Sequence, residues 1–144
     1  MENKKFDFII IGAGPAGIFA ALEMAQKRPQ SRVLIVDTGR AISHRACPAR
    51  IDGQCKHCDP CAIVHGWAGA GAFSDGKLNT GTKDPRGEHI LRTFVRFGAP
   101  HDILIDAKPH IGTDELVTVV QNLRETIIHY GGEVRFGVKV TGLV

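Results

Sequence analysis

A glycine-rich turn between two short apolar runs constrains the fold of this chain more than any other feature. Residues 12–17 read GAGPAG, the pattern G-x-G-x-x-G, and follow the apolar run FDFIII at 6–11. From 15 to 27 the apolar spacing is helical, and RVLIVD at 32–37 is a second branched apolar run. Strand, turn, helix and strand in this order form a right-handed βαβ unit with parallel strands buried on both faces. The sequence therefore predicts an α/β fold of the Rossmann type.

The turn carries the residue types that a dinucleotide site needs. Gly12 permits a tight turn, Gly14 lets a pyrophosphate approach the backbone, and Gly17 lets helix and strand pack closely. The N-terminus of the helix offers N–H groups and a positive dipole end to phosphates, and Pro15 is tolerated in its first turn. Asp37, twenty residues after Gly17, would accept hydrogen bonds from ribose hydroxyls and disfavours a 2′-phosphate. The predicted site comprises Gly12, Gly14, Pro15, Ala16, Gly17 and Asp37; a purely structural βα turn is the alternative.

Size, composition and charge indicate a single globular domain. The chain has 144 residues, of which 43% are hydrophobic and 23% charged. The net charge is +3 without a run of five basic residues, so nothing indicates nucleic-acid binding. No apolar stretch reaches the roughly 18 residues of a membrane span, and glycines interrupt the N-terminal apolar run before it could resemble a signal peptide. We therefore expect a cytoplasmic protein that binds neither nucleic acid nor membranes.

Residues 38–109 form a long insertion with little periodicity, in which only 90–97 has the spacing of a short helix. Regular patterns resume at 113–140. Thr113 is predicted to cap a helix with an apolar stripe, Gly131 and Gly132 to end it, and 134–140 to form a strand of alternating pattern. The stripe consists of Leu116, Val120, Leu123 and Ile127. We interpret 1–144 as the incomplete N-terminal part of a Rossmann-like domain, divided into a βαβ unit at 6–37, the insertion at 38–109 and a helix and strand at 113–140.

Four cysteines lie within fifteen residues of the insertion, in the pattern C-x7-C-x2-C-x2-C. Thiolates separated by two residues can converge on one metal centre, and the triplet favours a [4Fe–4S] cluster over zinc, whose structural sites more often pair two separated C-x2-C knuckles. A redox-active dithiol and four inert thiols are the alternatives, and disulfides are not expected in a reducing compartment. The predicted ligands are Cys47, Cys55, Cys58 and Cys61.

A second glycine-rich segment, GWAGAGAFSDGK at 66–77, follows the cysteines. Its small residues expose backbone N–H groups and permit contact with a flat or phosphorylated ligand. The segment lacks the G-K-[ST] ending of a P-loop, so nucleotide hydrolysis is disfavoured. A flexible surface loop is the alternative, although such a loop would not need the apolar Trp67 and Phe73. We predict that Gly69, Gly71, Ser74 and Lys77 also contact the cofactor.

Three strings of this sequence resemble known flavoproteins. FIIIGAGPAGIFAALEMA at 8–25, with Asp37, resembles the FAD-binding segment of flavoproteins of the glutathione-reductase type, which have two dinucleotide-binding domains. CPARIDGQCKHCDPCAIVHGWAGAGAFSDGKL at 47–78 resembles the uncharacterised NAD(FAD)-utilising dehydrogenase family, whose members carry a Cys-rich stretch and a G-W-G-G-A-G-A-F-S-D-G-K-L block. Ala68 replaces the second glycine of that block. Residues 110–144 are similar to the helix and strand before the adenine-contacting V-x-x-L/I of such flavoproteins, which implies that Val140 lies at the adenine.

The resemblance implies an FAD-dependent oxidoreductase in which the flavin performs the redox chemistry. A cluster on the cysteines would pass single electrons, and NAD(P)H is a candidate electron donor. The family is longer than this chain, which stops four residues after its last predicted strand, so we expect an N-terminal fragment that is inactive alone. The sequence identifies no catalytic residue, redox substrate or oligomeric state. The alternatives are a non-catalytic, zinc-stapled nucleotide-binding scaffold and a fragment of an NAD-dependent dehydrogenase.

Overall fold

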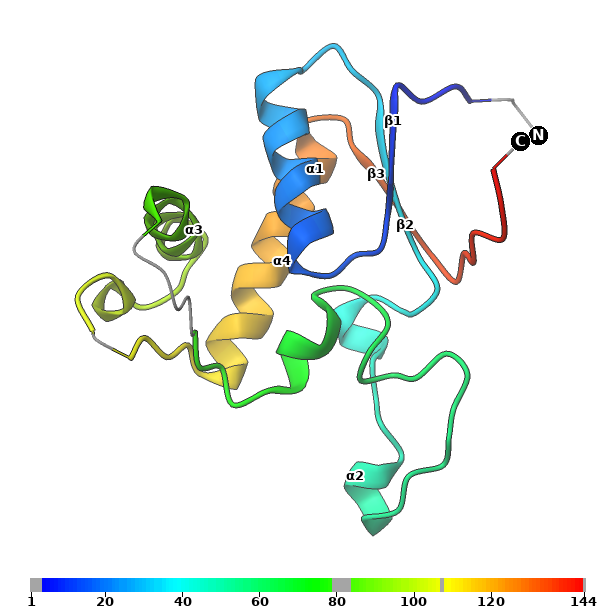
Figure 1. Cartoon of the computed structure of the whole chain (residues 1–144), viewed down its shortest axis with the longest axis vertical. Helices are drawn as coiled ribbons and strands as arrows, with labels where there is room; N and C mark the ends of the chain where they lie inside the picture. The colour runs from blue at the N-terminus through cyan, green and yellow to red at the C-terminus, as the bar shows by residue number, and fades with distance from the viewer. Residues whose placement is uncertain (1–3, 79–83, 107, 144) are drawn as a thin grey trace.

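Three short parallel strands organise the chain (Figure 1). The computed structural model describes residues 4–78, 84–106 and 108–143. Strands β1 (Phe8–Ile11), β2 (Val33–Asp37) and β3 (Glu133–Phe136) form one sheet in the order β1-β2-β3. In this register Ile10 lies beside Ile35, and Ile35 lies beside Val134. The sheet confirms the predicted α/β class and the parallel, incomplete Rossmann-like arrangement.

Two helices cover one face of the sheet. Helix α1 (Pro15–Lys27) connects β1 to β2 and has the predicted bounds, and α4 (Thr113–His129) precedes β3. Figure 1 shows both helices on the same side of the strands, where they pack against each other. The predicted apolar stripe of α4 is confirmed, because all four of its side chains are buried, together with Val119. These residues join Ile18, Leu22 and Ile35 in the main core.

The opposite face of the sheet is only partly covered. Every residue of β2 is buried, whereas β1 alternates, with Ile9 59% and Ile11 61% exposed. The prediction that both strands are buried on both faces is therefore right for β2 and wrong for β1. The difference arises because α1 and α4 lie together on one side, and no described helix covers Ile9 and Ile11.

The insertion is more helical than its sequence pattern predicts. It contains α2 (Ala49–Asp52), α3 (Pro85–Arg96) and three short 3-10 turns, η1 (Ile42–His44), η2 (Gly69–Phe73) and η3 (His101–Leu104). Helix α3 begins five residues before the predicted start at residue 90. Asp84 explains this start, because its Oδ1 accepts a hydrogen bond of 2.8 Å from the N–H of Arg86. Residues 79–83 and 107 of the predicted insertion lie outside the described residues.

Two further boundaries differ from the prediction. Thr113 is the first residue of α4 and Gly112 is its N-cap, so the predicted capping role of Thr113 is wrong. Strand β3 ends at Phe136 rather than at residue 140, because Gly137 has a φ of +68° and turns the chain. The chain still follows the end of β2 at this point, since the N–H of Gly137 donates to the carbonyl of Gly39 and that of Val138 to the carbonyl of Asp37.

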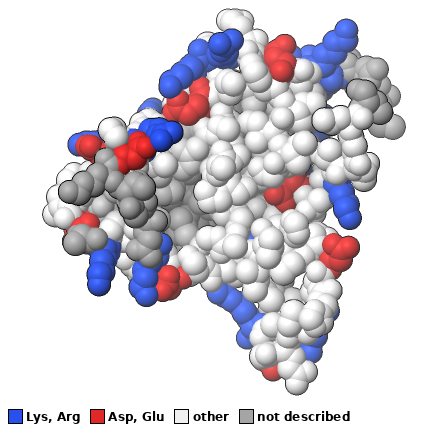
Figure 2. Space-filling view, viewed as in Figure 1, with Lys and Arg blue, Asp and Glu red and all other residues white. Residues whose placement is uncertain are grey.

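Charged side chains of both signs are interspersed around the rim of the face shown in Figure 2, and much of its middle is uncharged. The longest described helix, α4, has 17 residues. Among the described residues, no helix combines the length and the apolar character that crossing a membrane requires.

Two adjacent isoleucines of α4 test which face of the helix supports the fold. Ile127 is fully buried, whereas Ile128 is 44% exposed. We expect Ile127→Ala to lower the free energy of unfolding by about 2–5 kcal/mol because it leaves a cavity in the core, and Ile128→Ala to lower it by about 1 kcal/mol or less. Urea unfolding of both variants measures the difference. Equal losses would show that α4 does not face the sheet as described.

Candidate functional site

The GAGPAG turn connects β1 to α1 and leaves open space at the start of the helix. Gly12 has a φ of +101°, which glycine adopts readily, and its N–H donates to the carbonyl of Val36 at 2.8 Å. A Cβ on Gly17 would collide with the carbonyl oxygen of Gly12, so the structure bears out the close packing predicted for Gly17. A Cβ on Gly14 would meet no atom within 4 Å. Gly14 is the N-cap of α1 and has no side chain, so no side-chain hydrogen bond caps the start of the helix.

The second glycine-rich segment packs directly onto this turn. The N–H of Ala68 donates to the carbonyl of Ala13 at 2.8 Å, and a Cβ on Gly69 would lie 3.2 Å from the Cα of Gly14. Trp67 is fully buried, and its Nε1 donates to the carbonyl of Val120 in α4 at 2.6 Å. The segment is therefore anchored in the core, which argues against the alternative of a flexible surface loop.

Asp37, at the end of β2, joins three separate parts of the chain. Its carboxylate is buried; Oδ2 accepts the N–H of Ala13 at 2.8 Å, and Oδ1 accepts those of Gly39 and Gly66, each at 2.7 Å. A carboxylate has about four lone-pair positions, so these bonds occupy most of its acceptor capacity. Its predicted bond to ribose hydroxyls stays a prediction. The connection to Gly39 and Gly66 is a role that the sequence did not indicate.

Arg45 is a second buried charge beside Asp37, and no pattern in the sequence indicates its burial. Its guanidinium donates four hydrogen bonds, all to backbone carbonyls of residues 62–69. Burial lowers the pKa of Arg45, while the nearby Asp37 carboxylate and Cys61 raise it. Arginine nevertheless stays charged in proteins, so the site holds a permanent cation.

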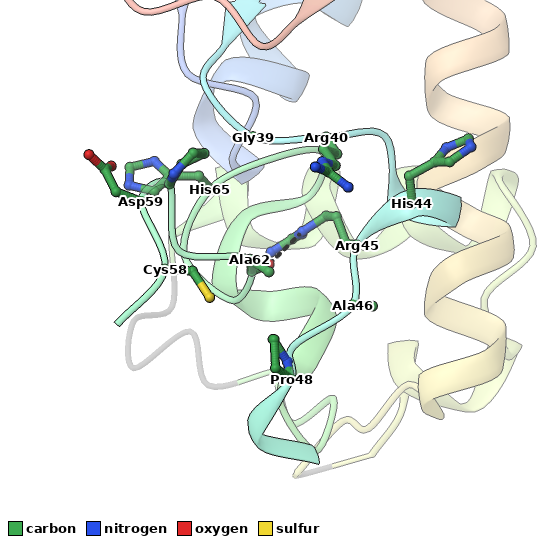
Figure 3. A pocket seen from close by; sticks show the side chains of 11 residues that line it. Gly39, Arg40, His44, Arg45, Ala46, Pro48, Cys58, Asp59, Ala62 and His65 are labelled. Atoms are coloured by element: carbon green, nitrogen blue, oxygen red, sulfur yellow. Dashed lines mark hydrogen bonds between the residues drawn. The ribbon is translucent and has the colours of Figure 1, made fainter. Parts of the chain in front are cut away.

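A hollow lies beside these residues, past the carboxyl end of β2. It has a volume of about 310 Å³ and lies between residues 39–48 and 58–65 (Figure 3). The Cys58 sulfur and the Arg45 guanidinium point into it, and Asp59 and His65 lie side by side at one end. A neighbouring hollow shares Asp59 and His65 and extends to Gly137 and Lys139. In open α/β sheets, ligands bind in the crevice outside the carboxyl ends of the strands, which is the position of these hollows.

Three other predicted contact residues, Ser74, Lys77 and Val140, do not line either hollow. The hydroxyl of Ser74 donates to the carbonyl of Gly71 at 2.8 Å and accepts the N–H of Gly76. Lys77 pairs with Asp75 at 2.8 Å, and this partner raises the pKa of the Lys77 ammonium. Val140 follows β3 in an irregular segment and is 40% exposed. Contacts of these three residues with a cofactor stay predictions.

The four cysteines do not form a metal centre in this arrangement. All are free thiols; Cys55 and Cys58 are exposed, whereas Cys47 and Cys61 are half-buried. Within residues 4–78, 84–106 and 108–143, no three His, Cys, Asp or Glu side chains gather as a metal ion requires. Hydrogen bonds from the N–H groups of Val64 and Ile63, and the charge of Arg45, lower the pKa of the Cys61 thiol. The described cysteines as placed do not fit the predicted cluster or zinc ion.

Comparison with known proteins supports a flavin-binding interpretation of the first βαβ unit. Residues 7–47 match the FAD binding domain family, and this range contains β1, the GAGPAG turn, α1, β2 and Arg45. The match supports FAD binding by a domain of the oxidoreductase type. The chain is also 40% identical over 142 residues to an uncharacterised protein of Clostridium beijerinckii. That alignment covers 96% of this chain and 26% of the relative, so the chain spans about a quarter of the relative's length.

Gly17 and Gly14 provide a matched test of the turn. A methyl group on Gly17 meets the backbone of Gly12, whereas one on Gly14 meets open space. We expect Gly17→Ala to lower the free energy of unfolding by about 3 kcal/mol, and Gly14→Ala to lower it by about 1 kcal/mol or less. Thermal unfolding of both variants compares them. If Gly14→Ala destabilises the chain as much as Gly17→Ala, the space at the start of α1 is filled by protein.

Ala68 has a left-handed backbone conformation, with a φ of +72°, at the position where the resembled family carries glycine. This conformation costs an L-residue about 1–2 kcal/mol, which offsets the benefit of the buried methyl group. We expect Ala68→Gly to leave the stability unchanged or raise it by up to about 1 kcal/mol. The control Ala21→Gly, at a fully buried position in α1, should lower stability by about 2 kcal/mol. Similar losses in urea unfolding of both variants would contradict the conformation assigned to Ala68.

Proposed function

We propose that this chain is the N-terminal, FAD-binding part of an FAD-dependent oxidoreductase, and that it holds the ADP half of FAD at the carboxyl edge of the sheet. The observation that carries the proposal is the docking of the 66–71 segment onto the GAGPAG turn, which leaves open space in front of α1. The match of residues 7–47 to the FAD binding domain family supports the same assignment. The activity and the substrate of a longer protein are part of this proposal.

The residues at the turn fit a pyrophosphate. The N–H groups of Ala16 and Gly17 begin a helix without a side-chain cap, and the dipole of α1 adds a partial positive charge there. Gly14 carries no side chain that would displace the phosphates. In our proposal, Gly69 and Gly71 border the same space from the second segment. Any contact of theirs with the phosphates would be made by the backbone.

The hollows at the ends of β2 and β3 fit the adenosine half. They adjoin Thr38, Gly39 and Gly137, which follow directly after the two strands. Three N–H groups occupy the Asp37 carboxylate, and in our proposal its remaining acceptor position takes a single ribose hydroxyl. The volume of about 310 Å³ lies within the usual range of ligand pockets, about 300–1,000 Å³.

Bound FAD would supply the redox chemistry through its isoalloxazine ring, whereas the residues of this chain would bind and orient its adenosine and phosphates. A metal cluster and an NAD(P)H donor are not part of this proposal, because neither the cysteine geometry nor the comparisons support them. The redox substrate and the cytoplasmic location stay predictions.

Titration with nucleotides tests the proposal. We expect the chain to bind ADP and FAD, and Gly14→Val to weaken both by about tenfold or more, since its side chain fills the phosphate space. The control is Ala20→Val on the exposed face of α1, which should change both affinities by less than about twofold. Isothermal titration calorimetry gives the affinities, and quenching of flavin fluorescence reports the isoalloxazine end.

Two results would contradict the proposal. If Gly14→Val binds ADP with the same affinity as the wild type, the phosphates do not bind at the GAGPAG turn. Tighter binding of NAD than of FAD would favour the alternative of an NAD-dependent dehydrogenase.

A further inference from the structure

The cysteine-bearing part of the insertion is a loop that one side chain closes at its base. Residues 51–60 are all exposed, and α2 projects away from the sheet at the bottom of Figure 1. Arg45 stands where the chain enters this loop. Its Nε donates to the carbonyl of Ala62 at 3.0 Å and its Nη2 to that of Ile63 at 2.6 Å, where the chain leaves the loop.

The same guanidinium also reaches the second glycine-rich segment. Its Nη1 donates to the carbonyls of Trp67 at 2.6 Å and Gly69 at 2.8 Å. The guanidinium carbon lies 4.7 Å from the centre of the Phe73 ring, which covers one face of the cation. Four of its five donors are therefore used on one stretch of backbone, and the side chain is 8% exposed.

We propose that Arg45 is the positioning residue that sets the 66–71 segment on the GAGPAG turn, and that the backbone of residues 61–71 takes this shape without a metal ion. Burying a guanidinium costs free energy unless its N–H groups donate hydrogen bonds. Because these N–H groups have a rigid planar geometry, the carbonyls that accept them within residues 62–69 are held in matching positions. The proposal rests on the proposed FAD site, because it names the residue that completes that site from the second segment.

A metal-based account of the loop makes the opposite prediction. If thiolates and a metal ordered this part of the chain, the loss of one ligand or of the metal would loosen residues 61–71. Cys55 and Cys58 lie instead on the exposed part of the loop, whereas the bonds of Arg45 are at its base. The two accounts therefore differ in which change loosens the segment.

Hydrogen exchange of the whole chain, followed by mass spectrometry, distinguishes them. The variants are Arg45→Met, Arg45→Lys and Cys58→Ser, and the wild-type chain is also measured with a chelator. Arg50→Met is the matched control, because the Arg50 guanidinium also lies over Phe73, at 5.0 Å, but Arg50 is exposed and its side chain donates no hydrogen bond among the described residues. The amides of β2 and α4 serve as an internal reference for global unfolding.

We expect Arg45→Met to speed exchange of the 62–69 amides by about tenfold or more relative to the reference amides. Arg45→Lys should lie between Arg45→Met and the wild type, because an ammonium cannot span the same carbonyls. Arg50→Met, Cys58→Ser and the chelator should leave these amides unchanged. Unchanged exchange in Arg45→Met, or loosening by the chelator equal to that of Arg45→Met, would overturn the proposal. If Arg45→Met does not fold, the exchange rates of the 62–69 amides are compared between Arg45→Lys and Arg50→Met. Faster exchange in Arg45→Lys supports the proposal, and equal exchange overturns it.

Nucleotide affinity provides a second test. A purely structural role of Arg45 would not make its replacement weaken ADP binding more than adenosine binding. Because Arg45 positions the segment beside the phosphates and also lines the hollow proposed for adenosine, Arg45→Lys should weaken binding of both ligands, with a loss for ADP about tenfold larger than that for adenosine. Equal weakening of both ligands would contradict the positioning role. Should the wild type bind no ADP, the proposed FAD site fails, and hydrogen exchange still decides whether Arg45 or a metal orders the segment.

Discussion

The buried carboxylate of Asp37 is the interaction on which the candidate site depends. It accepts N–H groups from the glycine turn, from the chain directly after β2 and from Gly66, so three segments distant in sequence meet at one group. Ionised acceptors form stronger hydrogen bonds than neutral ones, and an N–H group left without its partner here would be costly. The loops above the carboxyl edge of the sheet are therefore fixed by these polar bonds together with the burial of Trp67 in the main core.

Arg45 complements Asp37 with the opposite charge and the opposite kind of bond. Asp37 holds the 62–69 stretch through an N–H group, and Arg45 holds the same stretch through four carbonyls. The backbones of residues 39 and 66 consequently pack so closely that a Cβ on Gly39 would collide with residues 65 and 66. This contact places the second glycine segment against the GAGPAG turn. The two segments together border the space at the start of α1 where we propose that the pyrophosphate binds.

The sequence predicted the elements whose pattern is local and left out the contacts that are not. The branched runs, the glycine turn and the stripe of α4 each reflect a periodicity of 2 or 3.6 residues, so β1, β2, α1 and α4 could be located. The hydrogen bonds of Asp37 and Arg45 span up to 29 residues, and nothing in residue spacing indicates which carbonyls a guanidinium will meet. The cysteine spacing predicted a metal because the thiols are close in sequence. Closeness in sequence does not show that the thiols converge in the fold, and the folded loop leaves Cys55 and Cys58 exposed.

The central claim is that the two glycine segments form one nucleotide site, and an ADP titration followed by ¹⁵N NMR of the backbone amides tests it most directly. The account predicts that the amides of Gly14, Ala16 and Gly17 and those of residues 69–71 shift together, with the same apparent dissociation constant, while those of the exposed loop at 51–57 stay unchanged. A titration in which only one of the two segments responds, or in which the cysteine loop responds alone, would contradict it.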